Sequence, residues 1–174
     1  MRIFNARKEP HFIKAYERHF APFRDLPIRF LEIGVQNGGS MKMWESYFPL
    51  ADIVGIDNDP QCKQYEQGMV SIRIGDQSDK DFVKSLGSFD IVVDDGGHKM
   101  SQHFASFDVL FNQMKDGGIY AIEDLHTCYM DQYIDSKKTT EYIKDWIDGL
   151  QTKKLEYGIK SIHVYEGLVL IEKK

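Results

Sequence analysis

The stretch FDIVVDDGGH, residues 89–98, decides how we interpret the fold of this chain. It joins a run of apolar, mostly β-branched residues, typical of a buried strand, to two adjacent carboxylates, two glycines and a histidine. Because an unpaired carboxylate is costly to bury, Asp94 and Asp95 need partners, which can be a cation, hydrogen-bond donors or water. A strand that ends in this way indicates a site for a ligand or a metal.

Four more apolar runs precede or follow this one, and amphipathic segments with helical spacing separate them. The runs cover residues 28–34, 51–57, 70–76 and 118–124, and the main amphipathic segments cover 39–48, 79–87, 101–115 and 139–151. Strands that alternate with helices predict a parallel sheet covered on both faces. Two final runs meet at Gly167 with almost no loop, which predicts an antiparallel hairpin at one edge. The predicted fold is an α/β fold with a mostly parallel, seven-stranded, Rossmann-like sheet.

Length and composition narrow the class of protein. The 174 residues are 42% hydrophobic, which fits one domain over residues 28–174 with an N-terminal helical arm over residues 1–27. A net charge of −5 argues against a protein whose main function is to bind nucleic acid. Two cysteines without a framework spacing, no spanning apolar stretch and no signal-peptide core predict a reduced, cytoplasmic protein that is not inserted in a membrane.

The first three strands end in residues suited to an adenosyl ligand. Gly34 opens a glycine-rich turn before a helix, but Gln36 replaces the second glycine of the dinucleotide fingerprint, which disfavours a nicotinamide cofactor. Asp57 stands where an acid accepts hydrogen bonds from ribose hydroxyls. Asp76 can face the adenine amino group, and Gln77 can contact the ring. Since open α/β sheets bind ligands beyond the carboxyl ends of their strands, these residues should face one crevice.

The fourth and fifth strands end in residues suited to a metal. Asp95, Glu123 and Asp124 should converge if these two strands are neighbours, and their repulsion then requires a cation, for which hard oxygen ligands favour Mg²⁺. Asp94 can face the ammonium of the adenosyl ligand. We expect His98 to act as a general base for a hydroxyl, with capping of a helix or metal ligation as alternatives.

Two more histidines stand near these residues in the sequence. We expect His103 at the surface, because it begins a helix, whereas His126 can line a substrate pocket or orient Asp124. The N-terminal arm carries Phe12, Tyr16, Phe20 and Phe23 at near-helical spacing. It can pack over the cofactor or against a second subunit, and a homo-oligomeric state is left open.

Several motifs together resemble a known family. They are EIGVQNGGSMKMW, GID-x-x-P, GDQSD, FDIVVDDGGH, SF-x-x-LF and GGIYAIEDLHTCY, all between about residues 28 and 130. The combination resembles the metal-dependent sugar O-methyltransferases that tailor macrolide antibiotics, of the mycinamicin and tylosin type. This resemblance implies a class I S-adenosylmethionine fold, Mg²⁺ on Asp95, Glu123 and Asp124, and His98 as base.

The resemblance also implies contacts to the cofactor and a reaction. Asp57 and Asp76 match contacts to adenosine, while Glu32, Gly34 and Asp94 match residues around the methionine part. The expected reaction transfers a methyl group from S-adenosylmethionine to a sugar hydroxyl of a glycan precursor or glycosylated metabolite. The alternatives are methylation of a catechol-type small molecule and a module that binds S-adenosylmethionine without catalysis.

Overall fold

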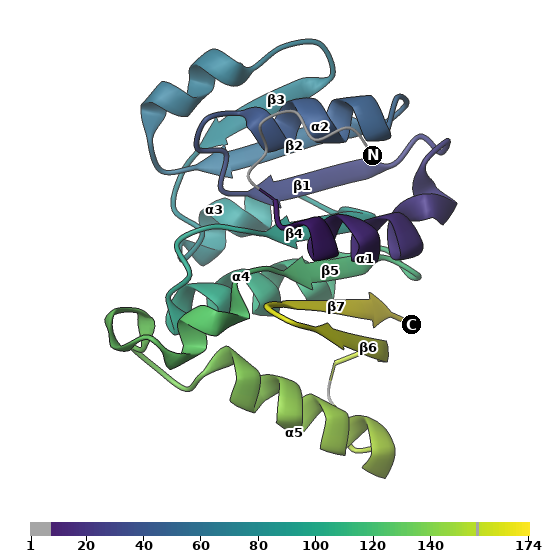
Figure 1. Cartoon of the computed structure of the whole chain (residues 1–174), viewed down its shortest axis with the longest axis vertical. Coiled ribbons are helices and arrows are strands. Elements are labelled where there is room, and N and C mark those ends of the chain that lie inside the picture. Colours follow the sequence, from purple (N-terminus) through teal and green to yellow (C-terminus); the bar gives the residue numbers. More distant parts are fainter. Residues whose placement is uncertain (1–7, 156) are drawn as a thin grey trace.

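The computed structural model describes residues 8–155 and 157–174, which form one layered α/β unit (Figure 1). The strands are β1 (Arg29–Ile33), β2 (Asp52–Asp57), β3 (Val70–Ile74), β4 (Ile91–Asp94), β5 (Ile119–Ile122), β6 (Ile159–Tyr165) and β7 (Leu168–Lys173). The α-helices are α1 (Pro10–Phe20), α2 (Gly39–Tyr47), α3 (Lys80–Ser85), α4 (Met100–Gln113) and α5 (Thr139–Thr152). Short 3₁₀-helices cover Ala21–Phe23, Pro60–Tyr65, Leu125–Tyr129 and Asp131–Tyr133.

The strands form one sheet in the order β3-β2-β1-β4-β5-β7-β6. Strands β1 to β5 are parallel, and β7 runs antiparallel to both β5 and β6. The predicted fold class is therefore confirmed, including the hairpin, whose turn contains Gly167 with a φ of 69°. The strand order reverses between the neighbours β1 and β4, and this reversal is where open α/β sheets form their ligand crevice.

Both faces of the sheet are buried, as Figure 1 shows by the helices in front of and behind it. Alternate residues of each strand point to opposite faces. On one face, Phe30, Ile53 and Val93 pack with α1 and α2. On the other face, Leu31 and Val92 pack with α4 and α5. This alternation also decides where the polar residues at the strand ends point.

Helix α1 is part of the core of the domain. Its Phe12, Tyr16 and Phe20 are at most 3% exposed, and the Tyr16 ring meets the Trp44 ring of α2 edge to face. The described part of the predicted N-terminal arm therefore packs on the sheet of its own chain, while residues 1–7 lie outside the described residues. None of the described helices is long and apolar enough to cross a membrane.

Candidate active site at the carboxyl ends of the strands

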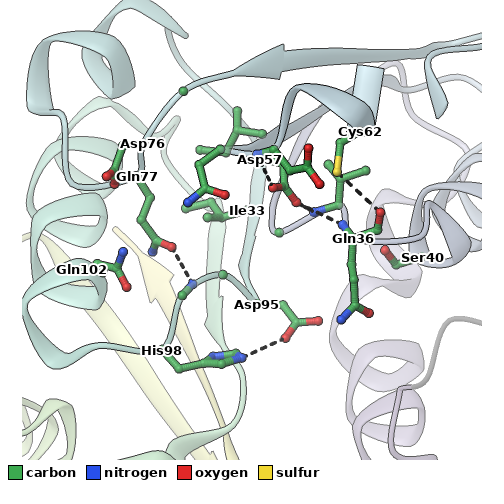
Figure 2. Close-up of a pocket in the computed structure, with 18 of the residues that line it drawn as sticks. Ile33, Gln36, Ser40, Asp57, Cys62, Asp76, Gln77, Asp95, His98 and Gln102 are labelled. Carbon is green, nitrogen blue, oxygen red and sulfur yellow. Dashed lines mark hydrogen bonds and ion pairs between the residues drawn. The ribbon is translucent and has the colours of Figure 1, made fainter. Parts of the chain in front are cut away.

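A cavity of about 480 Å³ opens beyond the carboxyl ends of the parallel strands (Figure 2). Its volume lies in the range of small-molecule and cofactor sites. Seven of the predicted site residues line it: Gly34, Asp57, Asp76, Gln77, Asp95, His98 and Asp124. The other three, Glu32, Asp94 and Glu123, are buried beneath or beside it. The crevice predicted from the strand ends is present, but not every acid faces it.

Asp57, at the end of β2, organises the turn between β1 and α2. Its Oδ2 accepts hydrogen bonds from the backbone N–H of Val35 at 2.9 Å and of Gln36 at 3.0 Å, and Oδ1 accepts one from Asp59 at 2.9 Å. Burial raises the pKa of Asp57, but these backbone donors outweigh it and leave the pKa below its ordinary value. The carboxylate is thus charged and fixed at the cavity wall.

Glycine is required at position 34 because the backbone comes very close to β4 there. Gly34 has a φ of 93°, and a Cβ at this position would lie 2.1 Å from the carbonyl oxygen of Asp95. Such a distance is far inside van der Waals contact, so any side chain would separate β1 from β4. The predicted role of Gly34 next to a ligand remains a prediction, but its structural role is clear.

Asp76 and Gln77 follow β3 and line the cavity in Figure 2. Asp76 accepts hydrogen bonds from the backbone N–H of Ser78 at 2.8 Å and from its hydroxyl at 2.5 Å, and these bonds lower the pKa of Asp76. The Gln77 side chain accepts a hydrogen bond from the N–H of Gly97 at 2.8 Å. Gln77 therefore connects the loop after β3 with the loop after β4.

The structure places Asp94 elsewhere than predicted. As the last residue of β4 it pairs in register with Ile33 and Ile122, which point to the α4 face, and its carboxylate is fully buried there. It accepts hydrogen bonds from Ser106 at 2.7 Å, Gln77 at 3.1 Å and Tyr120 at 3.2 Å. Strand alternation thus turns Asp94 to the α4 face, and it contacts the cavity lining through Gln77 and, at 3.4 Å, through the backbone N–H of Gly96.

The two glycines after Asp95 let two amide side chains approach the loop. A Cβ at Gly96 would lie 2.1 Å from Oε1 of Gln77, and one at Gly97 would lie 2.2 Å from Oε1 of Gln102. The loop then reverses at His98, whose φ is 58°. This arrangement explains the DDGGH sequence: the glycines provide room for the glutamines, and the turn brings His98 back toward Asp95, as Figure 2 shows.

Asp95, His98 and Asp124 form an outer group that faces the cavity. His98 Nε2 lies 3.6 Å from Oδ2 of Asp124 and 3.9 Å from Oδ1 of Asp95, and the three side chains are 19–33% exposed. These separations are longer than hydrogen bonds, so these atoms do not satisfy one another. One atom from each residue lies within 4.8 Å of the other two, a spacing that one metal ion can bridge.

Glu32 and Glu123 form a second, inner group around Lys8. Strand alternation turns both glutamates toward α1, where Nζ of Lys8 lies 2.9 Å from Oε1 of Glu32 and 2.7 Å from Oε1 of Glu123. The same ammonium lies 2.5 Å from Oδ2 of Asp95. The hydroxyl of Tyr16 also donates to Oε1 of Glu123, at 2.6 Å. The predicted ligands Asp95, Glu123 and Asp124 are therefore split between two groups that share Asp95.

Burial dominates the electrostatics of the inner group. It raises the pKa of Glu123 to about 8, against the opposing effects of Lys8 and Tyr16, and it also raises the pKa of Glu32. Burial lowers the pKa of Lys8, but the charges of Glu123, Glu32 and Asp95 outweigh it and leave the pKa well above its ordinary value. Lys8 is therefore charged, whereas the raised pKa of Glu123 favours its protonated form near neutral pH.

Sequence reasoning did not identify Lys8 or assign Tyr16 a role at the site. Lys8 lies 87 residues from Asp95, and no local motif connects the two.

The prediction for His103 was wrong: its side chain is buried, with Nδ1 3.0 Å from the Thr139 hydroxyl. His126 is 64% exposed, and its Nδ1 lies 3.9 Å from Oδ1 of Asp124.

Strained backbone also marks this cavity. Among the described residues, four that are not glycine have a positive φ, and three of them, Gln36, His98 and Asp124, line the cavity. Each such conformation costs of the order of 1–3 kcal/mol and is typically found where function requires it. The strain at His98 and Asp124 turns both side chains to the same side of the rim.

Comparisons with known proteins agree with this geometry. A scan against models of protein families found no match. The mycinamicin VI 2''-O-methyltransferase of Micromonospora griseorubida is 34% identical over 93% of this chain and 48% of its own length. A rhamnosyl tetracenomycin-C 2'-O-methyltransferase of Streptomyces olivaceus is 30% identical over 94% of this chain and 50% of its own length. The chain thus spans about half the length of the curated relatives it matches.

Solved structures give the same result. The MycE methyltransferase of the mycinamycin pathway, solved with Mg and S-adenosylhomocysteine, has a TM-score of 0.87 and 31% identity, over 93% of this chain and 49% of its own. A S-adenosylmethionine-dependent methyltransferase from Archaeoglobus fulgidus has a TM-score of 0.63 over 96% of both chains, which at 16% identity shows the fold alone. This chain is therefore homologous to the sugar O-methyltransferase family of the mycinamicin and tylosin type, and it has the class I methyltransferase fold.

Proposed function

We propose that this chain carries the catalytic site of a Mg²⁺-dependent methyltransferase that moves a methyl group from S-adenosylmethionine to a sugar hydroxyl. One observation carries the proposal. A single cavity has charged, fixed acids at one end, after β2 and β3, and at the other end, after β4 and β5, two carboxylates that each have an oxygen near a histidine. The first end suits an adenosine, and the second suits the activation of a hydroxyl.

At the adenosyl end, Asp57 and Asp76 would recognise the ligand. A carboxylate has about four lone-pair sites, and the backbone donors use three of those of Asp57. Because Asp57 lines the cavity, this carboxylate would accept a hydrogen bond from a ribose hydroxyl. Asp76 would accept from the adenine amino group. Gln77 connects the loop after β3 with the loop after β4. It would therefore hold the adenine-binding side of the cavity in place, besides any contact with the adenine ring.

At the other end, the outer group meets the requirements of a hard divalent ion. Asp95 and Asp124 supply carboxylate oxygens that no described donor occupies on the cavity side, and Mg²⁺ binds through one or two carboxylates while it keeps water or substrate oxygens. When bound, such an ion lowers the pKa of a coordinated hydroxyl. The strained turns at residues 98 and 124 hold the two acids and the histidine on one side.

His98 would take the proton from the attacking hydroxyl. Its Nε2 points between Asp95 and Asp124, which stabilise the imidazolium after the proton is transferred. The Tyr133 ring meets the His98 ring edge to face, with ring centroids 6.1 Å apart. Proximity of the acceptor hydroxyl to the methyl group would supply much of the rest of the acceleration.

The sugar class of the acceptor rests on the relatives. The names of two relatives describe methylation at the 2' and 3' oxygens of a rhamnosyl tetracenomycin-C, and both match more than nine-tenths of this chain. We therefore propose a sugar-containing small molecule as acceptor.

The experiment is an assay of methyl transfer from labelled S-adenosylmethionine to a panel of rhamnosides, other 6-deoxyhexosides and catechols, each with MgCl₂ and with EDTA. The proposal expects transfer to at least one glycoside that EDTA abolishes and Mg²⁺ restores. Transfer to catechols alone would show that the acceptor is a catechol and not a sugar. S-adenosylhomocysteine binding without transfer to any acceptor would instead support a binding module.

A further inference from the structure

The two ring nitrogens of His98 lie in different surroundings. Nε2 lies 3.9 Å from Oδ1 of Asp95 and 3.6 Å from Oδ2 of Asp124, at the cavity (Figure 2). Nδ1, in contrast, is buried and has no hydrogen-bond partner among the residues that the structure describes. A neutral imidazole carries one proton, and only the nitrogen without it can act as a base. The chemistry of His98 therefore depends on what lies beside its Nδ1.

His103 has an unpaired nitrogen on a neighbouring ring. The residue is 1% exposed, and its Nε2 is buried without a hydrogen-bond partner in the described part of the chain. The His98 and His103 rings meet edge to face, with centroids 6.1 Å apart and planes at 72°. Buried polar atoms rarely stay unpaired, and a buried water molecule often connects two of them. The two nitrogens can thus satisfy each other, one as donor and the other as acceptor.

The other hydrogen bonds of His103 decide which nitrogen is the donor. Its Nδ1 lies 3.0 Å from Oγ1 of Thr139, and the same hydroxyl lies 3.6 Å from Sδ of Met100. A thioether sulfur can only accept, so the single hydroxyl proton points to Met100, and Oγ1 accepts the proton on Nδ1 of His103. Burial lowers the pKa of His103 below 6.5, so the ring is neutral at neutral pH. Its Nε2 is then an acceptor, which leaves Nδ1 of His98 as the donor.

We propose that His103 is a positioning residue of the catalytic base: through one bridging water molecule, its Nε2 accepts the proton on Nδ1 of His98. Nε2 of His98 is thereby kept free to take the proton of the acceptor hydroxyl. This inference rests on the proposed function, in which His98 is the base. Without the contact to His103, the carboxylates of Asp95 and Asp124 would draw the imidazole proton of His98 to Nε2, where it prevents base catalysis.

The direct test is the tautomer of His98 in the full chain with S-adenosylhomocysteine and MgCl₂ present. Two-bond proton to nitrogen correlation spectra of isotope-labelled histidine distinguish a protonated ring nitrogen from an unprotonated one, and single substitutions assign the six histidines. At about pH 8.5, where histidine is neutral, wild type should carry the proton on Nδ1 of both His98 and His103. In His103→Asn, much of the His98 population should carry it on Nε2. A wild-type His98 with its proton on Nε2, or an unchanged tautomer in His103→Asn, would overturn the inference.

A matched pair of substitutions separates this role from packing. The amide of His103→Asn replaces Nδ1 and retains the contact with Thr139, whereas His103→Gln reaches the position of Nε2 and retains an acceptor for His98. His103→Asn should lower the single-turnover rate of methyl transfer about tenfold to hundredfold, with the affinity for S-adenosylhomocysteine unchanged. His103→Gln should recover most of the rate. Equal losses of rate in the two variants would mean that His103 acts by packing alone, and would refute the proposal.

Substitutions at Thr139 keep the test decisive if the His103 variants do not fold. Thr139→Val removes the hydroxyl that accepts from Nδ1 of His103, while Thr139→Ser retains it. Without that acceptor the His103 proton can move to Nε2, which turns the acceptor for His98 into a donor. Thr139→Val should therefore shift the His98 tautomer and slow methyl transfer, and Thr139→Ser should resemble wild type. An unchanged His98 tautomer in Thr139→Val would contradict the proposal.

The same samples distinguish this inference from the proposed function. Wild type that binds S-adenosylhomocysteine but transfers no methyl group to any acceptor would refute the proposed function, whatever the tautomer of His98. Wild type that transfers methyl groups and depends on His98, with no loss of rate and no change of tautomer in His103→Asn, would refute only the role of His103.

Discussion

The two sides of the cavity hold their acids by different means. On the β2 and β3 side, Asp57 and Asp76 each accept a backbone hydrogen bond from a residue two positions ahead, Asp59 and Ser78. On the β4 and β5 side, Asp95 and Glu123 pair with Lys8, which is 87 residues away from Asp95. Backbone donors from its own loop hold Asp76, and donors from its own loop and from the turn after β1 hold Asp57, whereas the second side is complete only when α1 has docked. The difference predicts a division of labour: binding on the first side and chemistry on the second.

The largest expected effect tests the chemical side. His98→Ala should lower methyl transfer by about a hundredfold to ten-thousandfold, the range for loss of a general base, while the affinity for S-adenosylhomocysteine stays the same. His126→Ala is the matched control, because His126 also lies 3.9 Å from Asp124 but is 64% exposed. Single-turnover rates and calorimetry on both variants measure the two quantities. Full turnover in His98→Ala would show that His98 is not the general base.

The next effect tests the binding side. Asp57→Asn should weaken S-adenosylhomocysteine binding about tenfold or more, because hydrogen bonds to a charged group contribute about 1.5–3 kcal/mol. Asp79→Asn serves as control, since Asp79 caps α3 through the N–H groups of Asp81 and Phe82 and does not line the cavity. Calorimetric titration compares the two. If Asp57→Asn slowed turnover but left the affinity intact, the division of labour would be wrong.

A third effect tests the docking of α1. Tyr16→Phe leaves a buried oxygen of Glu123 with one donor fewer and should cost about 1–3 kcal/mol of unfolding free energy. Urea unfolding measures this cost, with Tyr47→Phe, a buried tyrosine on the same face, as comparison. A change within experimental error of the Tyr47→Phe value would mean that the inner group does not hold α1 in place.

The smallest expected effect concerns pH. Burial lowers the pKa of His103 below its ordinary value of 6.5, so the folded protein binds fewer protons there than the unfolded chain. Its contribution to stability is present above pH 6.5 and is lost as the pH falls below that value. Thermal unfolding between pH 5 and pH 7.5 should show a smaller decline in His103→Gln than in wild type. If the stability of both proteins fell equally with decreasing pH, the buried His103 would not contribute to the pH dependence.

The sequence predicts the binding side better than the chemical side. Strand ends followed by a loop that contains their own donors, as at Asp57 and Asp76, follow from short patterns, and so do the hairpin at Gly167 and the pairing of β4 with β5. The side of the sheet to which Asp94 points can also be predicted from the sequence. Two-residue periodicity puts it on the same face as Val92, away from Asp95.

Other features have no local signal. Lys8 reaches the site because α1 packs against Trp44 and the sheet, and this contact depends on the whole fold. His103 is buried because Thr139, which is 36 residues later, covers it. The environment of Glu123 has a local and a tertiary cause. Strand alternation turns its side chain to the α1 face, and the packing of α1 places the Lys8 ammonium beside it.

The most direct test of the central claim is a thermal-unfolding titration of wild type with S-adenosylhomocysteine, with NAD⁺ as the competing ligand, in MgCl₂ and in EDTA. At about 100 times its dissociation constant, a ligand that binds only the folded state stabilises by about 2.7 kcal/mol, enough to raise the melting temperature by several degrees. We predict this rise for S-adenosylhomocysteine and none for NAD⁺, with a further rise in Mg²⁺ that Asp124→Asn removes. Stabilisation by NAD⁺, or by neither ligand, would contradict the assignment of the cavity.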